Sequence, residues 1–336
     1  MEKNKRIKID DIAKLVGYST GTVSRAINNR PDISEKTRRK ILKTMEEVGY
    51  RPNVIAQSLA SSQTHTVALI IPNNTTPFLS SIALAIDREL YSKNYDMVLS
   101  NTYWDPEIEW QKLMFSEAKC VDGIILKPCN ENVERYHSLR IPIIIISHTC
   151  KDNSSFIDIE NDRVGYIAAK HLLDCGYTRI AFIGGERNTS VVQQRFKGFM
   201  CALQERNILF EPTFAKYGDY SIECGYNNMN ALMTLPTPPD AVFACSDTIA
   251  LGVFQTSIEK GIDVPEQLGI VGVNNDEVGA LPYVSLTTVD QSVTKMGELA
   301  ARMMIEQIEN GDEWKPQKVL LYPELIVRST TRAIRK

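Results

Sequence analysis

The 336-residue sequence has no long hydrophobic run and few cysteines or histidines. No segment reaches the roughly 18 consecutive apolar residues that a membrane-spanning helix needs, so we expect no membrane partner. The seven cysteines form no C-x-x-C pair, and the four histidines lack metal-ligand spacing. Scattered cysteines and an N-terminus without an apolar signal region predict a reduced, cytoplasmic protein with no metal site.

The motifs of catalysis and of nucleotide binding are also missing. The sequence has neither a Walker A motif nor G-x-G-x-x-G. Residues 17–21 match the G-x-S-x-G nucleophile elbow, but that motif follows a strand, whereas a helical pattern precedes these residues. Since no nucleophile–base pair is apparent, we predict that the protein is not an enzyme and needs no cofactor.

Positive charge is scarce overall but concentrated at one end of the chain. The net charge is −3, yet residues 1–62 carry +6 and the remaining residues carry −9. A basic head on an acidic body is typical of a protein with a nucleic-acid-binding module. On charge alone, a solvated basic face without a partner is the alternative.

The basic head has the pattern of a helix-turn-helix. Apolar residues of 9–16 recur at i, i+3, i+4 and i+7, which predicts a helix. A glycine then permits a turn, and Ser19 can cap a second helix. On its outer face, Arg25 suits a guanine edge or a phosphate, and Thr20 suits a base edge. A plain helical hairpin would show similar apolar spacing.

The body alternates short apolar runs with amphipathic stretches. Strands are predicted at 67–71, 95–100, 122–126, 143–146, 180–183, 241–244 and 270–273, and helices at 78–93, 162–175, 190–206 and 247–260. This alternation predicts doubly wound parallel sheets, and the length of the body favours two lobes. The loops after the strands are rich in Asn, Ser, Thr and Asp, which suits a hydroxyl-rich ligand, although such residues also simply make turns.

Several segments carry a resemblance to a known family. They are IAKLVGYSTGTVSRAIN at 12–28, SEKTR at 34–38, GYRPNVIAQSLA at 49–60, VDGII at 121–125, RIAFIG at 179–184, SDTIALG at 246–252, LTTVDQ at 286–291 and PELIVRST at 323–330. Together they resemble the LacI/GalR family of bacterial repressors along essentially the whole chain. The resemblance implies an α/β protein with a small helical helix-turn-helix head and a two-lobed, periplasmic-binding-protein-like body of doubly wound parallel sheets.

The resemblance also implies the domain limits. Residues 1–52 form the DNA-binding domain, 53–63 the hinge helix and linker, and 64–336 the effector-binding and dimerisation core. Within the core, the N-lobe takes about 64–161 and 291–321, and the C-lobe about 162–290 and 322–336. The chain crosses three times between the lobes, and a small-molecule effector binds between them.

DNA contacts are implied on the second helix and on the hinge. They are Ser19, Thr20, Gly21, Thr22, Ser24, Arg25 and Asn28 in the head, and Asn53, Ala56, Gln57 and Leu59 in the hinge. Leu59 matches the leucine that wedges between base pairs in the minor groove, although it could be an ordinary helix-face leucine. The resemblance implies a homodimer, and its two heads would bind a pseudo-palindromic operator in double-stranded DNA.

The resemblance carries over the effector-binding positions only in part. They are Phe78, Ser147, Glu160, Arg195, Tyr220, Ser246, Asp247, Asn274 and Gln291. Arg195 suits bidentate hydrogen bonding to a ligand. Ser147 and Asn274 stand where relatives often carry Asp, so two carboxylates are missing. The resemblance therefore does not identify the ligand. Loop packing is the alternative role for each position.

The leading hypothesis is a dimeric repressor of carbohydrate-metabolism genes. A sugar or sugar derivative would favour one relation between the lobes and so release the hinges from the operator. The alternative keeps the fold but reverses the effect of the ligand on operator affinity, so that a purine-like corepressor or a phosphoprotein strengthens DNA binding. A non-regulatory sugar-binding module is a third possibility, against which the basic head argues.

Overall fold

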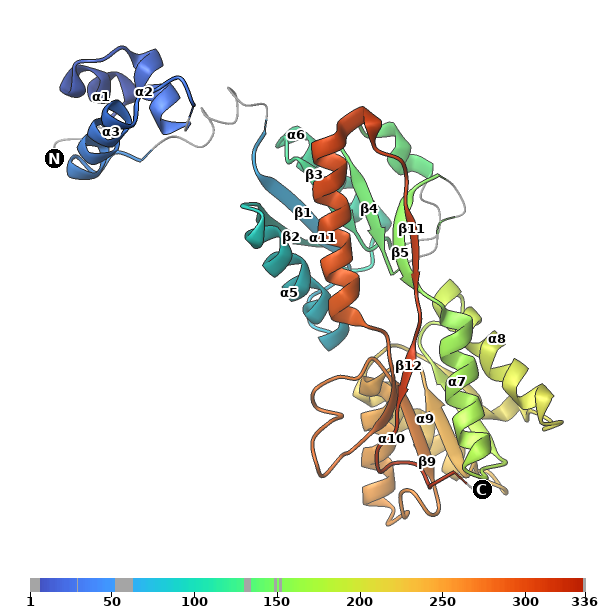
Figure 1. The fold of residues 1–336 in the computed structure, drawn as a ribbon. Coiled ribbons are helices and arrows are strands. Elements are labelled where there is room, and N and C mark those ends of the chain that lie inside the picture. Colours follow the sequence, from blue (N-terminus) through green and yellow to red (C-terminus); the bar gives the residue numbers. More distant parts are fainter. Residues whose placement is uncertain are drawn as a thin grey trace. The chain divides into compact units, whose positions relative to one another are not determined.

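The computed structural model describes residues 7–28, 30–51, 63–129, 134–147, 150 and 153–334. The chain forms two compact units, residues 1–64 and 65–336 (Figure 1). The predicted hinge contacts Asn53, Ala56, Gln57 and Leu59 lie outside the described residues.

The head contains three helices, α1 (Ile9–Val16), α2 (Thr20–Ile27) and α3 (Glu35–Glu47). The turn between α1 and α2 depends on Gly17, whose φ of +76° lies in the left-handed region that favours glycine. The Ser19 hydroxyl accepts a hydrogen bond from the backbone N–H of Thr22 and so caps α2. At the start of α1, the Lys8 side chain cannot accept such a bond. Instead, Asp11 accepts one from the Lys8 backbone N–H.

A small apolar core holds these helices at an angle. It contains Ile12 and Val16 of α1, Val23 of α2, and Ile41 and Met45 of α3, all of them buried. The predicted helix-turn-helix is therefore present, and its second helix turns the opposite face outward.

The body contains two six-stranded sheets. The first has the order β11-β5-β4-β3-β1-β2 and the second β12-β10-β9-β8-β6-β7. The strands of the first are β1 (Thr66–Ile71), β2 (Asp96–Asn101), β3 (Gly123–Leu126), β4 (Ile143–Ile146), β5 (Ser155–Ile159) and β11 (Lys318–Leu321). Those of the second are β6 (Ile180–Gly184), β7 (Ala215–Tyr217), β8 (Ala241–Ala244), β9 (Gly269–Val273), β10 (Thr287–Asp290) and β12 (Glu324–Ile326). All the pairings are parallel except β10 with β12.

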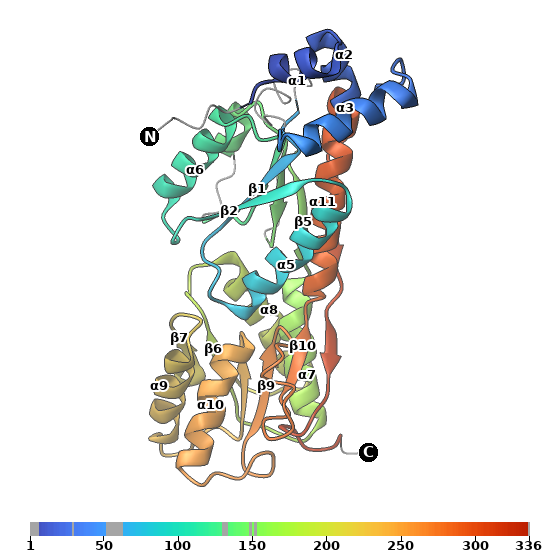
Figure 2. The ribbon, with the colours of Figure 1, turned by 90° about the vertical axis from the view of Figure 1, so that its left-hand side faces the viewer.

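Helices cover both faces of each sheet. The first sheet carries α5 (Pro77–Ser92), α6 (Pro106–Ala118) and α11 (Val293–Asn310), and the second carries α7 (Asn161–Asp174), α8 (Ser190–Glu205), α9 (Ile222–Met233) and α10 (Asp247–Glu259). In β1, Val67 and Leu69 pack with α5, whereas Ala68 and Ile70 pack on the α6 side. Figure 2 shows α5 and α11 together on one side of this sheet and α6 on the other. Burial on both faces explains the unbroken apolar run of β4.

Strand order shows where the chain passes from one sheet to the other. It does so after β5, after β10 and between β11 and β12. The predicted fold class is confirmed: a helical head precedes two parallel-sheet lobes. Among the described residues, no helix is both long and apolar enough to cross a membrane.

Candidate functional site

The outer face of α2 presents the head residues predicted to contact DNA. Thr20, Gly21, Arg25 and Asn28 are exposed. Thr22 and Ser24 are half-buried, and the exposed Ser19 caps the helix. Because the apolar residues of α2 face the core, the polar face is available for a groove of DNA.

Two of these side chains are held by carboxylates elsewhere in the head. The Thr20 hydroxyl donates to Asp10 at 3.1 Å. Arg25 donates from Nη1 to Asp32 at 3.0 Å and from Nε to the Gly21 carbonyl at 3.2 Å. Sequence reasoning missed Asp10 and Asp32, because no local spacing links either of them to α2.

In the body, Arg195 is the centre of a buried polar cluster. It lies in α8 and is 4% exposed. Its Nε donates to Asn161 at the start of α7 (2.9 Å), and its Nη1 donates to the Cys245 carbonyl at the end of β8 (2.7 Å). Its Nη2 donates to Gln291, just after β10, at 2.9 Å. Segments that follow β5 of the first sheet and β8 and β10 of the second thus converge on a single guanidinium.

From Arg195 the hydrogen bonds continue through two amides to a carboxyl. Gln291 Nε2 donates to Asn274 Oδ1, and Asn274 in turn bonds the carboxylate of Asp276. The turn after β9 that carries both residues is strained at Asn274, whose φ is +120°. We call the set Arg195, Gln291, Asn274 and Asp276 the polar chain.

A second carboxyl, that of Asp247, contacts the polar chain at the backbone of Asp276. It is fully buried at the start of α10, where it accepts from the Thr288 hydroxyl at 2.6 Å and from the Asp276 backbone N–H at 2.7 Å. Burial raises the pKa of Asp247 to about 6. Partial burial and the negative charge of Asp247 raise the pKa of Asp276 to about 7. The site therefore holds two carboxyls that keep their protons to higher pH than an ordinary aspartate does.

Asp276→Asn is expected to stabilise the body at pH 8 and to do so roughly a third as much at pH 5. Because the folded pKa of Asp276 exceeds its ordinary value of 3.8, the folded state binds the proton more tightly, and stability falls as pH rises from about 4 to 7. The amide cannot ionise, so the gain at pH 8 should be on the order of 2 kcal/mol, because solvent screens part of the charge interaction at this half-buried side chain. Denaturant unfolding at both pH values measures it, with the exposed Asp312→Asn as the control. Equal pH profiles for wild type and Asp276→Asn would contradict the assignment.

Of the nine predicted effector residues, six lie outside the polar chain. Besides Ser246 and Asp247 at the start of α10, they are Phe78 at the start of α5, Ser147 just after β4, Glu160 just before α7 and Tyr220 just before α9. Phe78 and Tyr220 are half-buried, and burial raises the pKa of the Tyr220 phenol to about 12. The backbone N–H and C=O of Ser147 are occupied, by Ile157 and by Lys127 respectively. Ser246 caps α10 through a bond from the Ile249 N–H.

Sequence reasoning missed two members of this cluster, Asn161 and Asp276. Asn161 follows β5, a strand that the sequence pattern did not reveal, and the family resemblance indicated only its neighbour Glu160. Asp276 lay in a loop predicted to face a ligand, but nothing in the sequence distinguished it from its neighbours. Only the packing against Asp247 does so.

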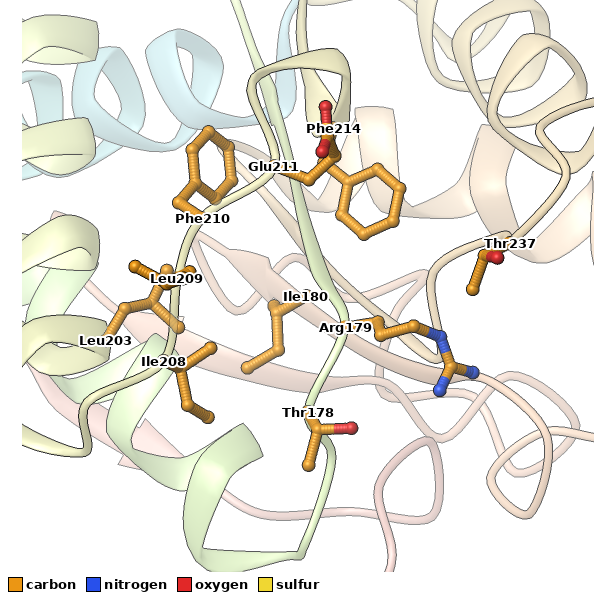
Figure 3. A pocket seen from close by; sticks show the side chains of 10 residues that line it. All are labelled: Thr178, Arg179, Ile180, Leu203, Ile208, Leu209, Phe210, Glu211, Phe214 and Thr237. Carbon is orange, nitrogen blue, oxygen red and sulfur yellow. The ribbon is translucent and has the colours of Figure 1, made fainter.

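A hollow of about 210 Å³ lies elsewhere on the second lobe (Figure 3). Leu203, Ile208 and Phe210 form part of its apolar wall, and Arg179 is at its edge. The Arg179 guanidinium is already engaged by the Pro238 carbonyl and by Asp240. None of the predicted effector residues lines this hollow, so it is separate from the polar chain.

The chain matches known proteins along nearly its whole length. Residues 8–53 match the family described as "Bacterial regulatory proteins, lacI family", and residues 169–331 match the "Periplasmic binding protein-like domain". The HTH-type transcriptional repressor PurR of Haemophilus influenzae is 32% identical over 333 residues, which cover 97% of this chain and 99% of PurR.

Solved structures agree with this relationship. The transcriptional regulator CelR in complex with cellobiose has a TM-score of 0.72 at 27% identity, covering 97% of this chain and 100% of CelR. The lac repressor dimer, bound to operator and the anti-inducer ONPF, has the same fold with a TM-score of 0.90 at 23% identity, covering 98% of this chain and 100% of the repressor. This chain belongs to the LacI family of bacterial transcriptional regulators, which are DNA-binding proteins of the cytoplasm rather than enzymes.

Proposed function

We propose that this regulator is a homodimeric repressor whose operator binding is controlled by a small ligand held beside the polar chain. The observation that carries the proposal is the convergence of Arg195, Gln291 and Asn274 from three separate elements. Such buried polar convergence is costly to build and is typical of a binding site. The exposed polar face of α2 supplies the DNA-binding end.

For the ligand, we propose a purine-like corepressor ahead of a sugar inducer. The sequence hypothesis ranked a sugar first, but kinship with repressors named PurR at 32% identity favours the corepressor alternative. The chemistry of the polar chain agrees, because the amide of Asn274 and the donors of Arg195 suit the mixed donors and acceptors of a nucleobase edge. The half-buried rings of Phe78 and Tyr220 would suit its planar faces.

A sugar is the second candidate. It is favoured by the likeness to the CelR–cellobiose complex. However, carboxylates are strong acceptors for sugar hydroxyls, and Ser147 and Asn274 replace two of those expected. An inducing sugar would have to depend on amide and arginine groups instead.

Ligand titration against a selected operator tests the proposal. Full-length protein is first used to select sites from a randomised double-stranded DNA library. Thermal shift with purine nucleobases and with saccharides such as cellobiose then finds what stabilises the fold. We expect a purine to raise both the melting temperature and the operator affinity. A sugar that lowers operator affinity would instead support the inducer hypothesis, and failure to select any site would refute the DNA-binding role of the head.

Arg25→Ala is expected to cost about 1–3 kcal/mol of operator binding at one base pair, because a bidentate contact to guanine is lost. Fluorescence anisotropy with the selected operator and its single-base variants measures this loss. An equal loss on random DNA would make Arg25 a phosphate contact. Lys43→Ala, on the exposed side of α3, serves as a control for general charge loss.

The proposed homodimer has a candidate surface at the edge of the first sheet. Strand β2 ends that sheet, and it exposes Val98 and Leu99. The flanking helices expose Leu84 and Tyr91 on α5 and Phe115 on α6. A sheet edge that no described strand covers, with exposed apolar side chains on both flanking helices, is a surface on which another molecule can pack. We propose that a second copy of this chain packs there, since the similar lac repressor structure is described as a dimer.

Leu84→Asp is expected to weaken the dimer at least 10-fold, because it buries a charge in an apolar interface. Sedimentation equilibrium of the full-length protein measures the dimer dissociation constant. Leu209→Asp is the matched control, since Leu209 is 96% exposed and lies on the other lobe. If both variants dimerise as the wild type does, the interface lies elsewhere.

A further inference from the structure

Two carboxylates in the head hold the side chains with which α2 would read DNA. Asp10 of α1 accepts from Thr20, and Asp32 of the loop before α3 accepts from Arg25. We propose that Asp10 and Asp32 are specificity-determining residues. Asp10 makes the Thr20 hydroxyl accept a hydrogen bond only from a base amino group. Asp32 holds the Arg25 guanidinium in the orientation that matches guanine. The inference rests on the proposed role of α2 in base reading and goes beyond it.

At Thr20, the argument follows from the direction of one hydrogen bond. An ionised aspartate only accepts, so the single hydroxyl proton of Thr20 must point at Asp10 Oδ1, 3.1 Å away. Toward DNA, the hydroxyl then offers only lone pairs. In the major groove the base donors are the N4 amino group of cytosine and the N6 amino group of adenine. Thr20 therefore selects adenine or cytosine on the strand that it touches and rejects the carbonyl edges of guanine and thymine.

At Arg25, two bonds from different nitrogens fix the plane of the guanidinium. Nε donates to the Gly21 carbonyl, and Nη1 donates to Asp32. Nη1 has a second proton and Nη2 has two, so the guanidinium still has donors for O6 and N7 of guanine.

Asp32 also has an electrostatic effect on every DNA sequence. Its ion pair with Arg25 is half-exposed, at 51% and 53%, so it contributes little while water surrounds it. When DNA covers the pair, water leaves and the bond strengthens, but the carboxylate then also lies near phosphates and weakens binding generally. Asp32 thus lowers affinity for all DNA while sharpening the choice of guanine, and a repulsive group of this kind increases specificity.

Single-group deletions in the DNA test both residues. Operators are selected from a randomised double-stranded library with full-length wild type, Thr20→Val and Arg25→Ala, so that each lost base preference locates a contact. At the Thr20 position, the base amino group is deleted with purine for adenine or pyrimidin-2-one for cytosine. In a second duplex, only the carbonyl of the opposing base is deleted. Coupling of each deletion with Thr20→Val, measured by anisotropy, shows which group the hydroxyl contacts.

We expect Thr20→Val to couple with the amino deletion, by roughly 3- to 10-fold in affinity, and not with the carbonyl deletion. In Asp10→Asn, the amide can donate to Thr20, so coupling should appear at a carbonyl as well. In Asp32→Asn, preference for guanine over the other bases should fall by roughly 3- to 10-fold, while affinity for random DNA rises and its salt dependence steepens by up to about one charge.

Glu47→Gln is the matched control, because it removes one exposed head carboxylate that pairs with Lys43 and does not contact α2 side chains. If Asp10→Asn and Asp32→Asn behave as Glu47→Gln does, or if Thr20→Val couples with a carbonyl in the wild type, the inference is wrong while base reading by α2 stands. If neither Thr20→Val nor Arg25→Ala changes any base preference, the proposed function of α2 itself fails.

Discussion

Gly198→Ala is expected to lower the free energy of unfolding of the body by about 3 kcal/mol or more. A Cβ on Gly198 of α8 would lie 1.7 Å from the carbonyl oxygen of Asp162 in α7. The reciprocal glycine, Gly165 of α7, would place its Cβ 1.8 Å from the Arg195 carbonyl oxygen. Backbone atoms cannot rotate away from such a contact, so the two helices would have to separate.

Denaturant unfolding of the full-length protein, followed by circular dichroism, measures the loss. Gly21→Ala is the matched control: the same change is made in a helix where a Cβ has room, and it should stabilise the head by roughly 0.5–1 kcal/mol. Separation of α7 from α8 would also stretch the bond from Arg195 to Asn161, so ligand binding should weaken as well. An unchanged unfolding midpoint for Gly198→Ala would show that the helices move apart at no cost.

Arg195→Met should lower the stability of the body by about 2–4 kcal/mol and weaken ligand binding at least 100-fold. Methionine fills a similar volume, so the loss comes from three buried acceptors left without their donor, on Asn161, Cys245 and Gln291. Relief from burying a charge offsets part of it. Arg195→Lys should recover little, because an ammonium cannot serve three acceptors in one plane.

Lys197→Met is the control for Arg195→Met. It removes a cation from the same helix, but its side chain is exposed and pairs with Asp162 in solvent, so we expect little change in stability. Unfolding curves give the stability, and calorimetry with the ligand found by thermal shift gives the affinity. Normal affinity in Arg195→Met would remove Arg195 from the binding site while leaving its structural role intact.

The sequence predicted the parts of the fold whose local pattern is strong. Both faces of β4 are buried, so its run of isoleucines was recognised as a strand, and the caps Gly17 and Ser19 marked the head helices. β5 was missed because its sequence SFIDI mixes polar with apolar residues. In that strand, Ser155 accepts from the Gln317 N–H, and such a long-range bond leaves no local signal.

The sequence predicted individual residues of the candidate site but not the contacts between them. Arg195, Gln291 and Asn274 were identified through the family resemblance, but their hydrogen bonding to one another depends on the order of strands in the second sheet. The raised pKa of Asp276 depends on its distance from Asp247, which is 29 residues away in sequence. Asp10 and Asp32 were invisible for the same reason, because tertiary packing brings them to α2.

The polar chain has a direction. At one end, Arg195 can only donate, and at the other, the carboxylate of Asp276, once ionised, can only accept. The amides of Gln291 and Asn274 between them therefore have a single orientation, with each oxygen toward Arg195 and each NH₂ toward Asp276. A ligand meets a donor and acceptor pattern that is already set and that cannot adapt by flipping an amide. Two molecules of equal size that differ only in swapping a carbonyl for an amino group should thus differ sharply in affinity.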